Sequence, residues 1–419
     1  MRHFPVILAT ACAALAVIGC APEALAPDGV QGQDVDVLNA VLTATTAENP
    51  PATADLPDDA GGAPDSTDTA PTVAAVSRTF SGNVGGDGDY QLFELGVGNP
   101  GDEWAISPTG SMSGPFIVVL FDSDENLLMR MFMSYSKPLR LVLREHSNQV
   151  YLGIMPPSGR NGGGFQLNAS VETGRSVPAP APQVVWLNFA AGNNIRVHTR
   201  DGVSFPAFDG GMLGEAYEGH TQLIKDAILR EMRADYASYN VTISSSDDGP
   251  PPDGPHSTVH FGSDESGLLG LADNVDNYNQ NPTQDAIIYV ENFAPYWTMQ
   301  LEPDEMAVMI ANVGSHELGH LLGLYHTQDP DDIMDTTGSA WDLAENQSFI
   351  RGPLEPTVFA TGWEDSPRLL EQIVGVNPDS AKSVAREKSA KSATYKAIRR
   401  FAQEELTYTC GTCLSLDHE

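Results

Sequence analysis

Short apolar runs alternate with turn residues through the first half of the chain. Each run has the length of a strand, and Gly, Asn, Asp and Pro residues recur between the runs. The runs lie at 90–95, 116–121, 139–143, 149–154 and 165–171. Recurrent runs of this length between turn signals are typical of domains in which two β-sheets pack face to face. The pattern therefore predicts an all-β sandwich domain over residues 77–175.

A different periodicity begins in the second half of the chain. Residues 184–189 have the composition of a buried strand, and Ile224, Ile228, Met232 and Tyr236 then recur at fourfold spacing along one stripe. Such a stripe predicts an amphipathic helix whose apolar face packs on a core. Three more strand-like runs follow, at 241–244, 258–261 and 286–290.

A second helix is predicted by its start signals. Pro303 suits the first helical position, where its missing N–H would have no partner, and Asp304 and Glu305 favour the positive end of the helix dipole. The helical pattern extends to about Leu322. The order of strand, helix, strands and long helix predicts an α/β domain over residues 183–380, with the long helix behind the sheet.

Two segments lack the composition of a packed domain. Residues 178–182 read Pro-Ala-Pro-Ala-Pro and are expected to form a stiff linker between the two domains. Residues 20–76 are rich in Ala, Pro, Asp and Thr, and from 21 to 75 they contain no aromatic residue and no Lys or Arg. Such a segment cannot bury enough apolar surface to fold, so we expect a disordered tether; a propeptide is the alternative.

The N-terminus has the features of an export signal. A basic start precedes an apolar run over residues 4–18, which is too short to cross a bilayer and is typical of a signal peptide, here residues 1–19. Val17-Ile18-Gly19-Cys20 resembles the cleavage box of bacterial lipoproteins. This resemblance implies a lipidated Cys20 that anchors the protein to the membrane of the cell envelope, the outer membrane in a diderm. Cleavage without lipidation, and therefore secretion, is the alternative.

The charge of the chain excludes one class of partner. It carries 56 Asp and Glu against 22 Lys and Arg, for a formal net charge of −34. The resulting potential repels phosphate backbones, so nucleic acid is not an expected partner. Alternating oxygen donors at 121–126 and 273–277 are candidates for structural Ca²⁺, although the same residue types are common in turns.

The clearest chemical pattern lies at the end of the second predicted helix, where residues 316–326 read His-Glu-Leu-Gly-His-Leu-Leu-Gly-Leu-Tyr-His. His316 and His320 are one turn apart on one helix face, so both imidazoles can bind a single metal ion. Gly323 is expected to end the helix, because a residue without a Cβ adopts the left-handed turn at no cost, and to let the chain present His326 as a third ligand. Three neutral imidazoles leave a fourth tetrahedral position open, which is the arrangement of catalytic zinc.

Glu317 follows the first of these ligands but lies about 100° around the helix. It is therefore expected to avoid the metal, to sit at the solvent-facing mouth of the site, and to accept a proton from a zinc-activated water as general base. The same carboxylate, once protonated, can deliver the proton to the leaving amine.

The histidine pattern resembles the zinc-binding consensus of the metzincin metallopeptidases at every fixed position, and Ile333-Met334-Asp335 resembles their Met-turn. The short gap from His326 to Met334, with Thr327 after the third histidine, is most similar to matrixins. The resemblance implies a mixed twisted sheet with a long active-site helix, one catalytic zinc, a protein or peptide substrate, and a Met334 that packs beneath the metal without binding it. Asp335 departs from the Tyr-Pro that usually follows the methionine.

Residues 381–419 form a separate tail. Seven Lys or Arg occur between Lys382 and Arg400 against the single acid Glu387, which predicts a solvated basic helix. The alternatives are docking on the acidic catalytic domain and removal during maturation. Cys410 and Cys413 are expected to form a local disulfide in an oxidising compartment, with a thiolate latch on the zinc as the alternative.

The sequence therefore predicts an exported zinc metalloendopeptidase with Glu317 as general base. Two other functions use the same residues differently. A catalytically dead surface binding protein on the same fold would keep the histidines but has no use for Glu317. A zinc amidohydrolase would use the same ligands on non-peptide substrates.

Overall fold

The computed structural model describes residues 76–379, apart from 87, 111, 134–136, 199–201 and 264–266. These described residues all belong to one compact unit. The predicted signal peptide, Cys20, the tether up to residue 75, and the tail with Cys410 and Cys413 lie outside them. Among the residues described, no helix is both long and apolar enough to span a membrane.

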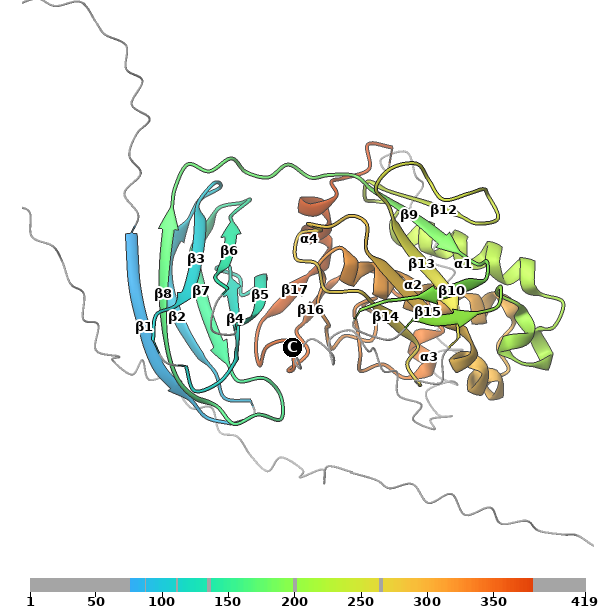
Figure 1. Cartoon of the computed structure of the whole chain (residues 1–419), viewed down its shortest axis with the longest axis horizontal. Helices are drawn as coiled ribbons and strands as arrows, with labels where there is room; N and C mark the ends of the chain where they lie inside the picture. Colours follow the sequence, from blue (N-terminus) through green and yellow to red (C-terminus); the bar gives the residue numbers. More distant parts are fainter. Residues whose placement is uncertain are drawn as a thin grey trace, which may run out of the picture. The chain divides into compact units, whose positions relative to one another are not determined.

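Residues 76–172 form a region of antiparallel strands, which we call the β-domain (Figure 1). The strands are β1 (Val76–Val84), β2 (Gln91–Gly98), β3 (Glu103–Pro108), β4 (Phe116–Phe121), β5 (Leu127–Met133), β6 (Leu139–Val142), β7 (Ser147–Met155) and β8 (Gly163–Glu172). They form two four-stranded sheets, one in the order β1-β8-β3-β6 and the other in the order β2-β7-β4-β5.

One apolar cluster of the β-domain contains side chains from both of its sheets. Phe116 of β4 and Phe165 of β8 meet edge to face, with ring centroids 6.0 Å apart. Ile106 of β3 and Leu152 of β7 are fully buried in the same cluster. Full burial of such a side chain contributes roughly 1.5 to 3 kcal/mol, so the β-domain has a core of its own.

The sequence pattern missed β1, β3 and β5. Strand β5 reads Leu-Leu-Met-Arg-Met-Phe-Met and has no exposed residue. Leu128 packs in the core of the β-domain, whereas Leu127 packs against residues from the second half of the chain. Because both faces of the strand are covered, the apolar and polar alternation that marks a strand is absent.

The remaining described residues mix strands and helices, and we call them the α/β-domain. Its elements are β9 (Gln183–Asn188), β10 (Gly192–Ile195), β11 (Val203–Phe205), η1 (Gly210–Leu213), η2 (Glu215–Tyr217), α1 (Thr221–Asp235), β12 (Val241–Ser245), β13 (Ser257–Gly262), β14 (Gly270–Ala272), β15 (Asp285–Tyr289), η3 (Val290–Met299), α2 (Pro303–Leu321), α3 (Ala340–Leu343), β16 (Arg351–Pro353), β17 (Trp363–Asp365) and α4 (Ser366–Ile373).

The main sheet of the α/β-domain has the strand order β12-β9-β13-β15-β14. Neighbouring strands are parallel except for the edge strand β14, which runs antiparallel to β15. The sheet is therefore mixed, as the metzincin resemblance implies. Strand β14 has only three residues and begins with a glycine, so the sequence pattern did not predict it.

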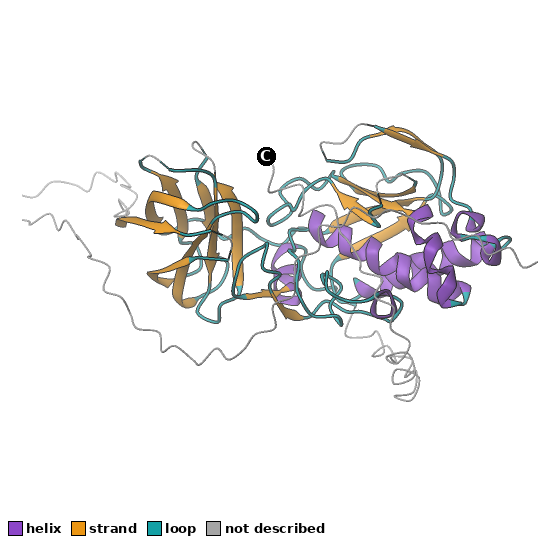
Figure 2. Cartoon of the chain, turned by 90° about the horizontal axis from the view of Figure 1, so that it is seen from below, coloured by secondary structure: helices purple, strands orange, loops and turns teal. Residues whose placement is uncertain are grey.

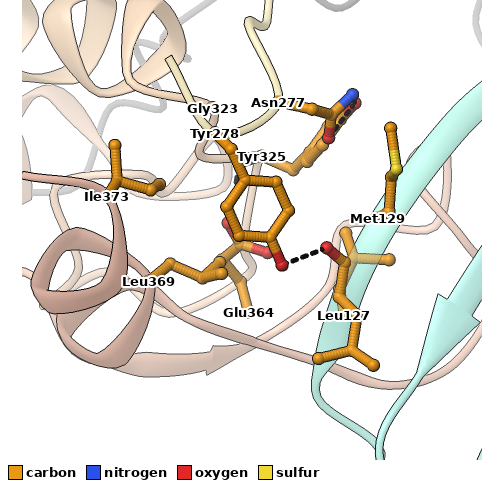
Figure 3. Close-up of a pocket in the computed structure, with 10 residues that line it drawn as sticks. Leu127, Met129, Asn277, Tyr278, Gly323, Tyr325, Glu364, Leu369 and Ile373 are labelled. Atoms are coloured by element: carbon orange, nitrogen blue, oxygen red, sulfur yellow. Dashed lines mark hydrogen bonds between the residues drawn. The ribbon is translucent and has the colours of Figure 1, made fainter. Parts of the chain in front are cut away.

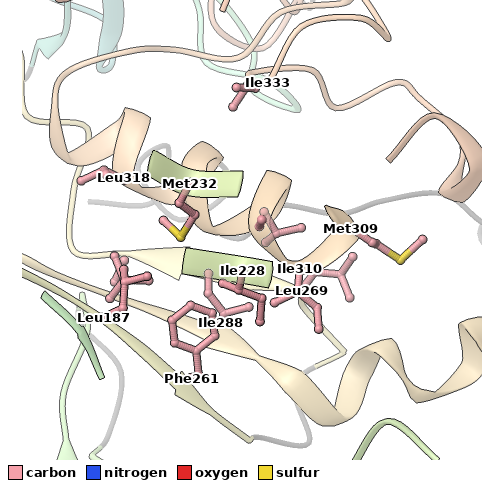
Figure 4. Packing of buried hydrophobic residues seen from close by; sticks show 14 of the residues in the cluster. Leu187, Ile228, Met232, Phe261, Leu269, Ile288, Met309, Ile310, Leu318 and Ile333 are labelled. Atoms are coloured by element: carbon pink, nitrogen blue, oxygen red, sulfur yellow. The ribbon is translucent and has the colours of Figure 1, made fainter. Parts of the chain in front are cut away.

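Helices α1 and α2 pack on each other and on this sheet (Figure 2). The predicted stripe on α1 is confirmed, since Ile224, Ile228 and Met232 are fully buried. Figure 4 shows Ile228 and Met232 in one apolar cluster with Ile310 of α2 and Phe261 of β13. The predicted position of the long helix against the sheet is likewise confirmed.

Candidate metal centre

Helix α2 carries the first two histidines, and its two ends explain their placement. At the start, Pro303 takes the first turn and the backbone N–H of Glu302 donates to the Glu305 carboxylate at 3.0 Å, which closes a capping box. At the end, Gly323 has a φ of 96°, and the N–H of Leu324 donates to the carbonyl oxygen of Gly319 at 2.9 Å. The predicted helix stop at Gly323 is therefore confirmed, and the chain turns back toward His326.

The three histidines converge. Nε2 of His320 lies 3.1 Å from Nε2 of His316 and 3.1 Å from Nε2 of His326. Tetrahedral zinc with bonds of about 2.0 to 2.1 Å keeps its ligand atoms about 3.3 Å apart, so this spacing fits one ion. Elsewhere in the described ranges, no group of three His, Cys, Asp or Glu side chains is gathered in this way.

The second ring nitrogen of each histidine faces an acceptor. Nδ1 of His316 lies 2.7 Å from the carbonyl oxygen of Ile333, and Nδ1 of His320 lies 2.8 Å from that of Leu324. A carbonyl oxygen only accepts hydrogen bonds, so Nδ1 carries the proton in both rings and Nε2 keeps its lone pair. Nδ1 of His326 lies 3.5 Å from Oε2 of Glu355.

Burial keeps the imidazoles of His316 and His320 neutral. His316 is 1% exposed and His320 is 0% exposed. Loss of solvation, with repulsion from His326 as a smaller cause, lowers the pKa of His316 to about 3. The pKa of His320 also lies well below its usual value, again mainly because the ring is buried. Neutral imidazoles with a free Nε2 are the form that binds zinc, so the donor set fits this metal.

Glu317 lies in surroundings that differ from the prediction. Its side chain is 0% exposed, so it does not sit at a solvent-facing mouth. A Cβ added to Gly270 would lie 2.5 Å from Oε1 and 2.6 Å from Cγ of Glu317. The carboxylate is buried because it lies directly against the backbone of the edge strand β14. The sequence analysis missed Gly270, because a glycine marks close backbone approach only within a recognised strand and β14 was not predicted.

Met334 lies against the turn of α2 that carries the ligands. It is fully buried, and a Cβ added to Gly319 would lie 2.6 Å from its Sδ. The carbonyl oxygen of Met334 accepts from the N–H of Thr327 at 2.9 Å, which ties the turn to the residue after His326. This is the position beside the ligand helix that the Met-turn resemblance implies.

The sequence analysis also missed Glu355. Besides facing Nδ1 of His326, it donates its backbone N–H to the carbonyl oxygen of His326 at 3.0 Å. Burial raises the pKa of Glu355, but hydrogen bonds with His326 and Thr357 outweigh burial and hold it below its usual value. No local spacing in the sequence connects Glu355 to His326, so no pattern could have indicated this contact.

The two runs considered for calcium have their carboxylates in turn contacts. Oδ1 of Asp122 accepts from the N–H groups of Asp124 and Asn126, each at 2.9 Å. Oδ2 of Asp276 accepts from the N–H of Asn281 at 2.7 Å. The contact between Asp122 and Asp124 is that of an ordinary Asx turn, and the other two are also local contacts within a loop. Calcium binding at these runs stays a prediction.

Comparison with known proteins supports the metzincin resemblance over part of the chain. Residues 244–347 match the family model of the matrixins. The matched segment includes α2, all three histidines and Met334. Among curated proteins, no significant match is found.

Solved structures show weaker likenesses. An archaemetzincin from Methanopyrus kandleri is 13% identical over 46% of this chain and 96% of its own, with a TM-score of 0.25. A periplasmic inhibitor of g-type lysozyme from Aeromonas hydrophila is 15% identical over 26% of this chain and 93% of its own, with a TM-score of 0.19. TM-scores this low carry no conclusion about fold or function. The histidine site and the matched segment together show that this chain is similar to the metzincin zinc metallopeptidases, with the matrixins as the matching family.

Proposed function

We propose that this chain is a zinc-dependent endopeptidase that hydrolyses peptide bonds in proteins or peptides. The observation that carries the proposal is the convergence of Nε2 of His316, His320 and His326. The match of residues 244–347 to matrixins supports a zinc metallopeptidase in general. Glu317, buried beside the first ligand, supports catalysis over binding alone.

Each residue of the site has a distinct part in the proposed reaction. His316, His320 and His326 would hold the metal through Nε2, and the acceptors at Nδ1 orient the rings. Bound zinc would supply a Lewis acid that acidifies water and polarises the scissile carbonyl. Glu317 accepts the proton of the attacking water and passes it to the nitrogen of the leaving amine. The backbone at Gly270 limits the rotamers of Glu317 and keeps its carboxylate in the site.

Strand β14 supports a peptide substrate. It is the edge strand of the main sheet, and its Gly270 touches Glu317. The outer side of an edge strand offers backbone N–H and C=O groups with which an extended peptide can pair. A peptide bound in this way would pass next to the proposed general base.

Glu317→Gln tests the catalytic role. The amide has the size of the carboxylate and leaves the three imidazoles in place, so zinc content should equal that of the wild type. Cleavage should fall by about 10² to 10⁴-fold, because a positioned general base is lost. The measurement is elemental analysis together with cleavage of mixed peptides by the full chain, with chelator-treated wild type as the control for metal dependence.

The other outcomes separate the alternatives. Equal cleavage rates in wild type and variant would remove Glu317 from the mechanism. A wild type that binds zinc but cleaves no peptide favours the catalytically dead binding protein. Hydrolysis confined to non-peptide amides favours the amidohydrolase.

We propose the remaining organisation from sequence and fold together. Residues 1–19 are a signal peptide, 20–76 a tether, 77–175 a β-sandwich domain, 183–380 the catalytic domain and 381–419 a basic tail. The apolar cluster shared by the two sheets supports the sandwich. The mixed sheet with α1 and α2 packed on it supports the extent of the catalytic domain.

We propose further that the enzyme is exported and anchored through lipid on Cys20. Two or more acyl chains on one residue give stable membrane binding, whereas a single chain does not. Cys20→Ala should therefore move the protein from the membrane fraction to the soluble fraction. Mass spectrometry of the mature N-terminus is the direct measurement. An unmodified N-terminus at another residue would contradict the anchor and indicate secretion.

A further inference from the structure

The third histidine is held differently from the other two. His316 and His320 lie on α2, and their Nδ1 atoms face backbone carbonyls. His326 lies in the loop after the helix, where its ring faces a carboxylate, Glu355, at 3.5 Å. The backbone N–H of Glu355 also donates to the carbonyl oxygen of His326 at 3.0 Å. Glu355 therefore contacts both the backbone and the ring of this residue.

The loop that carries Glu355 is held by a residue of the β-domain. Arg130 on β5 is 5% exposed, and its Nε donates to the carbonyl oxygen of Val358 at 3.0 Å. Its Nη2 donates to the carbonyl oxygen of Thr357 at 3.3 Å. The hydroxyl of Thr357 in turn donates to Oε2 of Glu355, the oxygen that faces His326. A chain of contacts thus runs from β5 to the ring of His326.

Tyr325, the residue before His326, contacts the same strand. Its hydroxyl donates to the backbone carbonyl of Arg130 at 3.3 Å, and the Arg130 guanidinium lies 5.6 Å from the centre of its ring. Its N–H donates to Oε1 of the fully buried Glu364 at 3.0 Å. Figure 3 shows Tyr325 and Glu364 in one pocket with Leu127 and Met129 of β5. The position of His326 thus depends on contacts that involve the β-domain.

We propose that Glu355 is a positioning residue for His326, and that Arg130 of the β-domain holds Glu355 in place. The inference rests on the proposed zinc site. A partner at Nδ1 fixes the tautomer and the orientation of a ligand ring, and it raises the basicity of the other nitrogen. A ligand on a loop needs this support more than ligands on a packed helix, because its backbone is less restricted.

The zinc affinity of the full chain tests Glu355. Glu355→Ala should lower the zinc affinity about 10 to 100-fold, measured by competition with a chromophoric chelator. Loss of a hydrogen-bond partner on a ligand imidazole has effects of this size. Glu355→Gln, which retains an acceptor oxygen, should recover part of the loss. Glu231→Ala is the matched control, because Glu231 is a buried carboxylate on α1 that pairs with Arg230. The visible spectrum of the cobalt-loaded protein should change in Glu355→Ala and remain unchanged in the control.

Arg130→Lys tests the link to the β-domain. Lysine keeps the charge and an apolar stem, but it lacks the planar guanidinium that donates to two carbonyl oxygens at once. Zinc affinity should therefore fall several-fold, which is less than the loss expected for Glu355→Ala. Arg140→Lys is the control, because Arg140 lies on β6 and pairs with Glu103 at the surface. In a Glu355→Ala background, Arg130→Lys should have a smaller effect than in the wild type, since part of its action passes through Glu355.

The outcomes are distinguishable. Wild type that fails to bind zinc would overturn the proposed function and this inference with it. Wild type that binds zinc, with the same affinity and cobalt spectrum in Glu355→Ala, would overturn the inference alone. If the effects of the two substitutions on zinc affinity were fully additive, Arg130 would have no part in holding Glu355 in place.

Discussion

Two glycines let functional side chains of the candidate site lie against backbone. An added Cβ would come within 2.5 Å of Glu317 at Gly270, and within 2.6 Å of Met334 at Gly319. Neither glycine has a positive φ, so the requirement at both positions is space and not a special backbone conformation. A single methyl group at either position must displace a side chain of the site.

We expect Gly270→Ala to reduce cleavage without removing the metal. The added methyl group overlaps both Cγ and Oε1 of Glu317, so the carboxylate must move, and a displacement of about 1 Å can cost roughly 10²-fold in rate. Zinc content should match the wild type, because the three atoms nearest the added Cβ all belong to Glu317 and none belongs to a histidine. Peptide cleavage and elemental analysis measure the two effects.

Gly114→Ala is the control for this substitution, since an added Cβ there meets nothing within 4 Å. Full activity in Gly270→Ala would show that β14 does not hold Glu317 in its working position.

At the scale of elements, the end of α2 determines where the third histidine lies. Gly323 meets two demands at once. Its φ of 96° is strained for a residue with a side chain, and an added Cβ would lie 2.7 Å from the carbonyl oxygen of Asp276 and 2.8 Å from the backbone nitrogen of Tyr278. The loop at 276–278 therefore packs directly on the helix stop. The turn toward His326 depends on both the conformation and this packing.

Gly323→Ala should destabilise the metal-free protein and weaken its zinc binding. The left-handed conformation alone costs about 1 to 2 kcal/mol for an alanine, and the clash with two backbone atoms adds to that cost. Because the chain must shift to relieve the clash, His326 should lose its position, and chelator competition should show lower zinc affinity. Urea unfolding of the metal-free protein measures the change in stability.

Gly375→Ala separates the two causes. Gly375 has a φ of 83°, but the nearest contact of an added Cβ is with the side chain of Pro180 at 3.3 Å. We expect it to show the conformational cost with unchanged zinc affinity. An equal loss of zinc affinity in Gly323→Ala and Gly375→Ala would contradict a specific role for Gly323.

At the scale of the whole molecule, the β-domain and the α/β-domain are joined by packing as well as by the linker. A shared apolar cluster contains Phe121 of β4 and Phe359, whose ring centroids are 5.4 Å apart. Arg368 on α4 pairs with Asp122 of the β-domain, and with Glu145 at 2.8 Å. The two domains are thus expected to unfold together.

Arg368→Met should destabilise the protein by about 3 kcal/mol at neutral pH in urea unfolding. Asp122 is 3% exposed, and a buried carboxylate that loses its cation is costly. Arg140→Met is the control, because the Arg140 side chain is 58% exposed and a surface pair contributes about 1 kcal/mol or less. A similar small loss in both variants would contradict the role of the Asp122 pair.

The effect of Arg368→Met should depend on pH with a defined sign. Burial alone would raise the pKa of Asp122, but hydrogen bonds from Asn126 and Arg368 hold it below its usual value. A depressed carboxyl pKa stabilises the folded protein above the unfolded-state value and loses this contribution as the pH falls through the folded-state value. The difference between wild type and variant should therefore shrink on acidification.

Much of the fold and the site could be predicted because local geometry controls it. The stripe on α1, the start of α2 at Pro303 and the stop at Gly323 depend on residues within a few positions of one another. The fourfold spacing of His316 and His320 places both rings on one helix face wherever the helix packs. The sequence by itself therefore determined the ligand helix, its ends and the three histidines.

Only the tertiary structure decided what surrounds those histidines. Apolar periodicity shows that a side chain is buried, but it does not show which distant segment buries it. Strand β14 covers Glu317 because of its place at the edge of the sheet, and Glu355 reaches His326 because its loop is held by Arg130 from the β-domain. These contacts join residues far apart in the chain, so they exist only once the strand order and the packing of the two domains are set.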